Sequence, residues 1–292
     1  MSIERDRFGF RGRTGLHAVQ TWREGVAADL TLYGRLVAAD LRGQMQYKLS
    51  FAILTVGSFF SLFLEFVAVL ILVGRFPHMA GWSAGEVAFL YGLVSISFGL
   101  AEMIVGGFDR FAMLIVRGDF DRVLVRPADP FVQLFSQEFQ LRRLGRVAQG
   151  IATLGVAQAL TGIVWTTPKL LYLPVVIASG ALLFAALFIL GATLCFWTVQ
   201  TNELTNILTN GGTVLASQPM DIYTDWFRRF FIFVVPLAFV TYFPALFFLD
   251  RPDALGLPVF FPFLPAPVAV AFFLVARTVW DFGVRHYQST GS

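Results

Sequence analysis

Long apolar runs separated by short charged segments dominate this chain. Six of the runs are predicted as membrane-spanning helices: 51–73, 87–106, 147–165, 171–199, 230–249 and 266–285. A helix rises 1.5 Å per residue and the hydrocarbon layer is about 30 Å thick, so about 20 apolar residues cross it. The pattern therefore predicts an all-α polytopic membrane protein with one six-span transmembrane domain over residues 51–285.

A helical stripe of large apolar residues precedes the first run. It comprises Trp22, Val26, Leu30, Tyr33, Val37, Leu41 and Met45, at steps of three or four residues. Arg23, Arg35 and Arg42 occupy the opposite face. This pattern predicts an amphipathic elbow helix over residues 22–48 that lies on the membrane surface and leads into the first span. Residues 1–21 and 286–292 are predicted as tails, and residues 1–50 contain no signal-peptide run.

Prolines interrupt the apolar pattern near the end of the chain. The stretch from Pro236 to Pro267 holds seven of them. Proline breaks helices, and non-helical backbone at membrane depth is tolerated only where protein buries it or where it lines a cavity. We interpret 242–265 as one or two short re-entrant helices on the outer side, before the last span. Two ordinary kinked helices joined by a loop at 250–253 are the alternative.

The few charges indicate the orientation. Charged residues make up 14% of the chain, against about 25% in soluble domains, too few to cover a water-exposed surface. With the six predicted spans, 19 of the 22 basic residues fall on one side, and only Arg75, Lys169 and Arg251 fall on the other. Because lysine and arginine accumulate in cytoplasmic segments, both termini are predicted to be cytoplasmic.

Residues that would support catalysis or metal binding are scarce. A P-loop needs Gly-Lys before Ser or Thr, but the two lysines, Lys48 and Lys169, follow Tyr47 and Pro168. The three histidines lie far apart, and Cys195 is the only cysteine. The arginine clusters flank apolar runs rather than form a nucleic-acid surface. We therefore predict a chain without catalytic residues, metal or nucleic-acid partner.

The segment 108–146 is the longest polar loop between two predicted spans. It contains a predicted short helix that Asp119 can cap. Phe120, Val123 and Leu124 would face one way, and Asp121, Arg122 and Arg126 would face solvent or a partner. From these residues alone, the helix either docks into a cleft of a cytoplasmic protein or rests on the lipid interface with its arginines on anionic headgroups.

The first and second predicted spans each contain one carboxylate. Glu65 is close to the middle of the first span, where it should face protein or water, or be protonated. It could meet a cationic substrate group or a proton, or serve as a neutral acid hydrogen-bonded to a serine or tyrosine of a neighbouring helix. Glu102 lies nearer the inner end of the second span and could pair with Arg110 or reach the interface.

Several short motifs follow one another in an order that resembles a known family. They are Gln46-Tyr47-Lys48, the segment Arg117–Pro127, Gln218–Tyr223 with Trp226 and Arg228, and the segment Trp280–Ser289. This order resembles the ABC-2-type permeases of bacterial ABC exporters, in the branch where two related permeases accompany one type of ATPase. The likeness covers nearly the whole chain, but members more often have Tyr-Pro where this chain has Gln218-Pro219.

The resemblance implies roles and partners for this chain. The loop helix would be the coupling helix that contacts the ATPase, through Asp119, Phe120, Asp121, Arg122, Leu124 and Arg126. The proline-rich segment would form the outer re-entrant helices. ATP and Mg would bind to two copies of a separate ATPase subunit, and this chain would carry no cofactor. A second permease, either a related different chain or a second copy, would complete the assembly among the lipids of the bacterial plasma membrane.

Two functions are compatible with these observations. The first is a permease subunit that exports a hydrophobic or amphipathic compound, cationic compounds included, by alternating access driven by partner ATPases. The second is an ion- or proton-coupled secondary transporter that uses Glu65 and Glu102 as titrating groups. Carriers of the second class commonly contain an internal repeat, and the two halves of this sequence show no convincing one.

Overall fold

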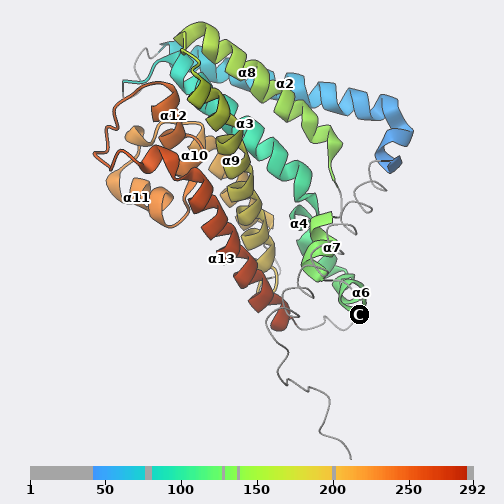
Figure 1. Cartoon of the computed structure of the whole chain (residues 1–292). Coiled ribbons are helices and arrows are strands. Elements are labelled where there is room, and N and C mark those ends of the chain that lie inside the picture. Colours follow the sequence, from blue (N-terminus) through green and yellow to red (C-terminus); the bar gives the residue numbers. More distant parts are fainter. Residues whose placement is uncertain (1–41, 76–80, 127–128, 137–138, 199–201, 288–292) are drawn as a thin grey trace, which may run out of the picture.

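The computed structural model describes residues 42–75, 81–126, 129–136, 139–198 and 202–287. This part of the chain is all helical and contains no strand, so the all-α character of the predicted fold is confirmed (Figure 1). The long helices are α2 (Lys48–Arg75), α3 (Ala84–Ile104), α8 (Leu144–Thr161), α9 (Thr167–Leu194), α10 (Asn202–Ala216) and α13 (Pro265–Arg285).

Short helices connect these long ones. They are η1 (Met45–Tyr47), α4 (Gly106–Asp109), α5 (Phe111–Val116), α6 (Phe120–Val125), α7 (Pro130–Ser136), η2 (Leu141–Arg143), η3 (Met220–Ile222), α11 (Asp225–Phe233), η4 (Leu237–Phe239), α12 (Tyr242–Phe248) and η5 (Phe261–Phe263). The elbow helix predicted for 22–48 falls mostly outside the described residues, and both predicted tails fall outside them except for His286 and Tyr287.

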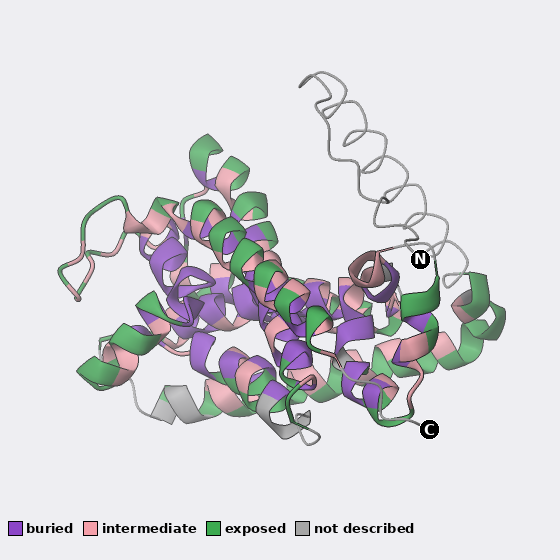
Figure 2. Ribbon diagram, turned by 90° about the horizontal axis from the view of Figure 1, so that it is seen from below, coloured by how far each residue is buried: buried purple, intermediate pink, exposed green. Residues whose placement is uncertain are grey.

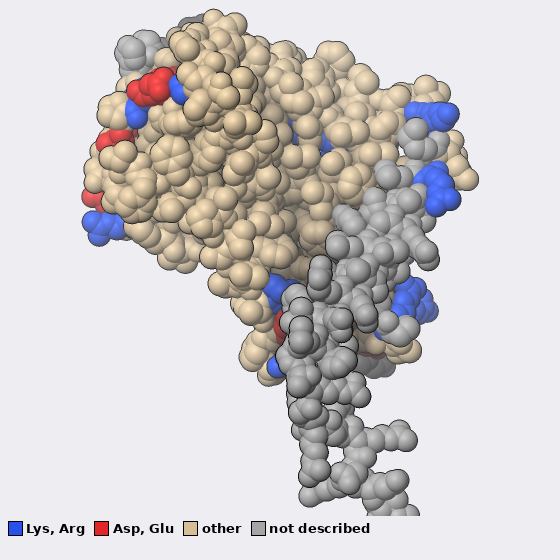
Figure 3. All heavy atoms as spheres, viewed as in Figure 1, with Lys and Arg blue, Asp and Glu red and all other residues tan. Residues whose placement is uncertain are grey.

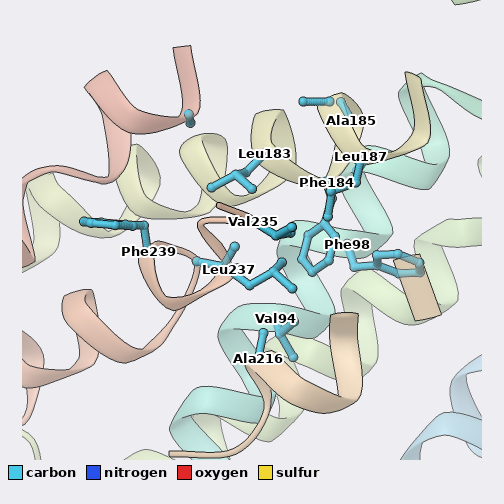
Figure 4. Close-up of a cluster of buried hydrophobic side chains, with 14 of the residues drawn as sticks. Val94, Phe98, Leu183, Phe184, Ala185, Leu187, Ala216, Val235, Leu237 and Phe239 are labelled. Carbon is cyan, nitrogen blue, oxygen red and sulfur yellow. The ribbon is translucent and has the colours of Figure 1, made fainter. Parts of the chain in front are cut away.

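Helix α3 forms the centre of the bundle and packs closely against α8 and α9. A methyl group at Gly92 would lie 2.7 Å from Leu154, and one at Gly180 would lie 2.6 Å from the Ser97 hydroxyl. Only glycine allows such close backbone approach, the usual means of helix association in lipid. Buried residues gather in the middle of the bundle (Figure 2), and Phe98 and Phe184 lie in its hydrophobic core (Figure 4).

The same close contacts define the directions of the helices. Gly85 of α3 lies against Leu160 near the end of α8, so α8 runs antiparallel to α3. Helix α9 begins six residues after α8 ends, and therefore starts at the same end of the bundle as α3. We name this end the Trp82 end, after the residue that precedes α3. The opposite end, where Gly283 of α13 contacts Phe196, is the Trp280 end.

Among the residues that the structure describes, four helices are long and apolar enough to cross a membrane: α2, α3, α9 and α13. They correspond to the first, second, fourth and sixth predicted spans. The third predicted span forms the helix α8, which includes Arg146, Gln149 and Gln158 and is less apolar than these four. On the face shown in Figure 3, charged residues gather at the margins around a broad uncharged area, as a membrane protein requires.

The fifth predicted span, 230–249, is not one straight helix. It divides into α11 and the segment 237–248, which meet at an angle of 72°. Pro236 separates the two parts because it lacks the N–H that a continuing helix would need. At the bend, Leu237 lies against Gly212, and Val240 lies against Gly180, both inside the bundle. The bent segment therefore enters the bundle and turns back, and begins earlier than the re-entrant segment predicted for 242–265.

Helix α10 was missing from the predicted spans because its sequence is polar, with Asn202, Asn206 and Asn210 among its residues. It runs antiparallel to α9, since Thr205 contacts Gly191 and Gly212 lies near Phe184. Residues that follow α10 consequently reach the Trp82 end. The six predicted spans place the loop 200–229, with Arg228 and Arg229, on the same side as the α6 loop, but the residues after α10 lie at the Trp82 end and the α6 loop lies at the Trp280 end. With Arg228 and Arg229 at the Trp82 end, the excess of basic residues on the side of the α6 loop is smaller but remains.

This arrangement predicts the sidedness of three exposed positions. In a Cys195→Ala background, single cysteines at Ile222 and Val259 should react with a membrane-impermeant maleimide from the same side, and one at Val125 only from the opposite side. These side chains are 38%, 89% and 85% exposed, so the reagent can reach each of them. Labelling of intact cells and of opened cells measures the sidedness. Reaction of the Ile222 and Val125 cysteines from one side would contradict this placement of α10.

Candidate functional site

Helix α6, the predicted contact helix, lies with α4 and α7 near the carboxyl end of α13 (Figure 1). Phe120 and Val123 are buried against the bundle, as predicted. Leu124 is 39% exposed, so its predicted place on the buried face is wrong. Successive side chains point in directions about 100° apart around a helix axis. The bundle lies between the directions of Phe120 and Val123, so Leu124 lies at the edge of the buried face and is partly exposed.

Asp119 precedes α6 but does not cap it through its side chain, contrary to the prediction. Its backbone is already helical, with φ −71° and ψ −16°, whereas a capping residue usually has extended backbone. Its carboxylate instead pairs with Arg122 at 3.2 Å, one turn further along the helix. Asp121 is half-buried on the same turn.

An aromatic cluster anchors α6 to the long helices. This Trp280 cluster consists of Phe108, Phe111, Phe120, Phe131, Phe196, Trp280 and Tyr287. The Phe120 ring centroid lies 5.0 Å from that of Tyr287 after α13 and 5.8 Å from that of Phe196 after α9. Trp280 is 1% exposed. Movement of α6 would therefore be transmitted to the ends of α9 and α13.

Helix α7 fixes the other side of α6. The Gln133 side chain donates a hydrogen bond of 3.0 Å to the Val123 carbonyl, one of the carbonyls that the last turn of a helix leaves unpaired. Asp129, just before α7, forms a 2.7 Å ion pair with Arg277 of α13. The Arg277 guanidinium also lies 4.2 Å from the centre of the Phe131 ring. The short helices and α13 thus form one connected unit.

The outward face of α6 combines charge with apolar surface. The Arg122 side chain is 83% exposed, and Arg126 is also exposed. Val125 beside them is 85% exposed, an unusual position for a valine unless a partner or lipid covers it. The sequence pattern predicts the arginines of this face but not the exposure of Val125.

Glu102 is 9% exposed and serves as a shared counter-ion. Its two carboxylate oxygens lie 3.0 Å from Arg143 and 3.3 Å from Arg146. The Arg146 guanidinium also stacks at 4.6 Å from the centre of the Phe98 ring. The sequence pointed to Arg110 as a partner of Glu102; the close packing of α3 and α8 brings these two further arginines to the carboxylate. Buried charges are tolerated when they are paired in this way.

Glu65 lines a polar pocket between α2, α3, α8 and α10. The pocket has a volume of about 100 Å³, and its polar lining comprises Glu65, Tyr91, Ser95, Arg146, Thr213, Ser217 and Gln218. Glu65 is exposed and forms no hydrogen bond or ion pair with any residue that the structure describes. The predicted bond to a serine or tyrosine is absent, although Tyr91 and Ser217 line the same pocket. A carboxylate exposed to lipid at this depth would cost roughly 2.5–3.5 kcal/mol.

A polar network at the Trp82 end does not follow from the sequence pattern. The Trp82 indole N–H donates to Asp221 at 2.8 Å, and the Tyr242 hydroxyl lies 2.7 Å from the other oxygen of the same carboxylate. Arg251 bonds both carboxylate oxygens of Glu86 at 2.8 and 2.9 Å and lies 4.5 Å from the centre of the Trp82 ring. The network joins α3, η3 and α12, whose residues are distant in the sequence.

The Trp280 cluster predicts a large effect of shortening Phe120. Phe120→Ala should destabilise the protein by about 3–5 kcal/mol, since it removes a fully buried ring and leaves a cavity. Val125→Ala on the same helix should change stability little because Val125 is exposed. Denaturant unfolding of the purified protein, monitored by tryptophan fluorescence, measures both. Equal effects of the two changes would show that α6 is not anchored through Phe120.

Glu102 offers a second test. Glu102→Gln should cost about 3 kcal/mol, since it leaves two partly buried arginines without a counter-ion. Asp225→Asn is the matched control: the Asp225 side chain is 78% exposed and pairs with Arg228, so its loss should cost less than about 1 kcal/mol. Thermal unfolding in detergent compares the variants. A neutral effect of Glu102→Gln would contradict the structural role of this ion pair.

A comparison with family models completes the description of the site. A model described as "ABC-2 family transporter protein" matches residues 59–291, about four fifths of the chain. The matched region begins within α2 and contains the pocket, α6, the Trp280 cluster and the Trp82 network. No curated protein and no solved structure matches the chain.

Proposed function

Because the chain belongs to the ABC-2 family of transporter proteins, we propose that it is the permease subunit of an ATP-driven exporter. Membership establishes a membrane permease of an ABC-type transporter, a class that works with an ATP-binding subunit. The proposed cargo is a hydrophobic or amphipathic compound. It leaves the cell by alternating access, and separate ATPase subunits provide the energy.

The anchoring of α6 is the observation that carries this proposal. Phe120 connects α6 to the ends of α9 and α13, and the opposite face presents Arg122, Arg126 and Val125 to a partner. A subunit that binds this face and moves during ATP hydrolysis would displace the ends of two long helices. Coupling by a two-state movement of packed helices is a recognised mechanism. This arrangement favours docking on a protein over rest on the lipid surface.

The proposed assembly contains two ATPase copies and a second permease, either a related chain or a second copy. In this proposal the permease itself performs no catalysis and binds no cofactor, and ATP and Mg bind to the ATPase. Six crossings are proposed: α2, α3, α8, α9, α10 and α13, with α11 and α12 entering from the Trp82 end. The Trp280 end, which contains α6, faces the cytoplasm of a bacterial cell, and both termini are cytoplasmic.

A gradient-driven carrier remains the second candidate function. It would need Glu65 and Glu102 as titrating groups. Arg143 and Arg146 hold the Glu102 carboxylate in two ion pairs, which gives it a structural role as a counter-ion between α3 and the α8 region. Glu65 alone would then have to couple the ion to transport. The structure thus favours the ATP-driven class over this alternative.

The exposed face of α6 predicts a partner-specific effect of charge reversal. Arg122→Glu with Arg126→Glu should weaken binding to the partner ATPase by about tenfold or more, since like charges at an interface cost several kcal/mol. Co-purification and substrate-stimulated ATP hydrolysis of the reconstituted complex measure this effect. Reversal of the charge of Arg228, which pairs with Asp225 toward the Trp82 end, is the control and should leave both unchanged.

The unfolding midpoint of each variant shows whether it is folded. Because Arg122 and Arg126 are exposed, their reversal should leave this midpoint within a few degrees of that of the parent protein. Co-purification at parental levels together with undiminished ATP hydrolysis would show that α6 is not the contact with the ATPase. The coupling role of Asp119 and Asp121, which the family resemblance implies, would then also be rejected.

A further inference from the structure

We propose that the Glu65 pocket binds a protonated amine of the transported compound. This inference rests on the proposed transport function and names the chemical class of its cargo. The pocket is lined by an acidic group, aromatic rings and apolar walls, and it lies within the bundle between α2, α3, α8 and α10. An amphipathic amine has the matching parts: a cationic donor at one end and an apolar body.

The position of Glu65 requires a partner that the described residues do not supply. The apolar part of α2 runs over residues 48–71, and Glu65 lies roughly 8 Å from its midpoint, well inside the hydrocarbon layer. Only 6% of this segment is buried, so α2 is mostly uncovered within the chain. A mid-membrane carboxylate is expected to face protein, water or a ligand. A cationic ligand satisfies that requirement at the pocket.

The other charged residue of the pocket does not neutralise Glu65. Arg146 forms its ion pair with Glu102 at 3.3 Å and stacks on Phe98. Arg143 pairs with the other oxygen of Glu102, so both arginines are bound to the same counter-ion. The pocket therefore offers a cation one carboxylate that lacks an ion pair among the described residues. An anionic cargo would meet this carboxylate first.

A second polar atom indicates an amine with N–H groups rather than a quaternary cation. The Oε1 atom of Gln218 is buried and has no hydrogen-bond partner among the described residues. Gln218 lines the same pocket as Glu65. A buried acceptor without a donor is unfavourable, and an ammonium group can donate to more than one oxygen. Tyr91 adds a ring surface that attracts cations.

Three probes with the same phenylbutyl body test this inference: 4-phenylbutylamine, its trimethylammonium derivative and 4-phenylbutanol. The permease with its ATPase, in lipid nanodiscs, is titrated with each probe, and binding is measured by equilibrium dialysis. The protonated amine should bind at least tenfold more tightly than the alcohol and more tightly than the quaternary cation. Glu65→Gln should remove at least tenfold of the affinity for the amine and change that for the alcohol less than twofold.

Gln218→Leu provides an independent variant, which should reduce the preference for the amine over the quaternary cation. Asp225→Asn removes an exposed carboxylate outside the pocket and should leave all three affinities unchanged. Equal affinity for amine and alcohol, or an equal loss of both in Glu65→Gln, would overturn the inference. Dissociation of the two permeases in Glu65→Gln with unchanged amine binding would also overturn it, because Glu65 would then belong to a subunit interface.

The outcome is separable from that of the proposed function. Charge reversal on α6 tests coupling to the ATPase, whereas the dialysis experiment measures binding without ATP. A complex that hydrolyses ATP in response to another compound, but shows no Glu65-dependent preference for the amine, would refute the amine site alone. Amine binding that depends on Glu65 in a chain that does not associate with an ATPase would refute the ATP-driven assembly alone.

Discussion

The close approach of α3 to α8 and α9 is the constraint on which the rest of the structure depends. Helices in lipid gain little from hiding apolar surface, so contact between small residues must hold them together. Gly92 and Gly150 provide that contact on one side of α3, and Gly180 of α9 provides it on the other. The first contact brings Arg143 and Arg146 of the α8 region to Glu102. Because both arginines are then bound to this carboxylate, the neighbouring pocket retains the carboxylate of Glu65 without an ion pair among the described residues. Backbone packing therefore determines the electrostatics of the pocket.

The two ends of the bundle are held by interactions of different kinds. At the Trp82 end, hydrogen bonds of 2.8 and 2.7 Å join Trp82 and Tyr242 to Asp221, and a displacement of about 1 Å would break them. At the Trp280 end, ring contacts with centroids about 5–6 Å apart surround Trp280. Such contacts depend less on exact geometry, and rings can shift against one another while remaining in contact. The Trp280 end can therefore accommodate small displacements of α6 that the hydrogen bonds at the Trp82 end would not tolerate.

Apolar periodicity was enough to predict the helices whose surroundings are uniformly apolar. The helices α2, α3, α9 and α13 follow from unbroken runs of such residues. Helix α10 was missed because Asn206 and Asn210 lower its hydropathy, and only its packing against α9 shows that it traverses the bundle. The prediction of one continuous fifth span was wrong for the opposite reason: the composition of this segment is apolar, but Pro236 bends it.

The candidate site was predicted in part. The charged face of α6 and the residue Glu65 were identified from the sequence, but partners distant along the chain, such as Arg143 for Glu102 and Asp221 for Trp82, depend on tertiary packing.

Glu65 of α2 and Glu102 of α3 differ in a way that separates structure from function. A carboxylate inside the membrane is costly, and a chain under selection for stability alone would either replace it or neutralise it. Glu102 is neutralised by two arginines and is nearly inaccessible. Glu65 lies in the same bundle, close enough to Arg146 to share a pocket with it, yet the packing of α3 against α8 directs that arginine to Glu102. Glu65, which has no ion pair among the described residues, lines a pocket with polar and aromatic walls. Its retention is explained if a ligand, rather than the chain itself, supplies the compensating charge.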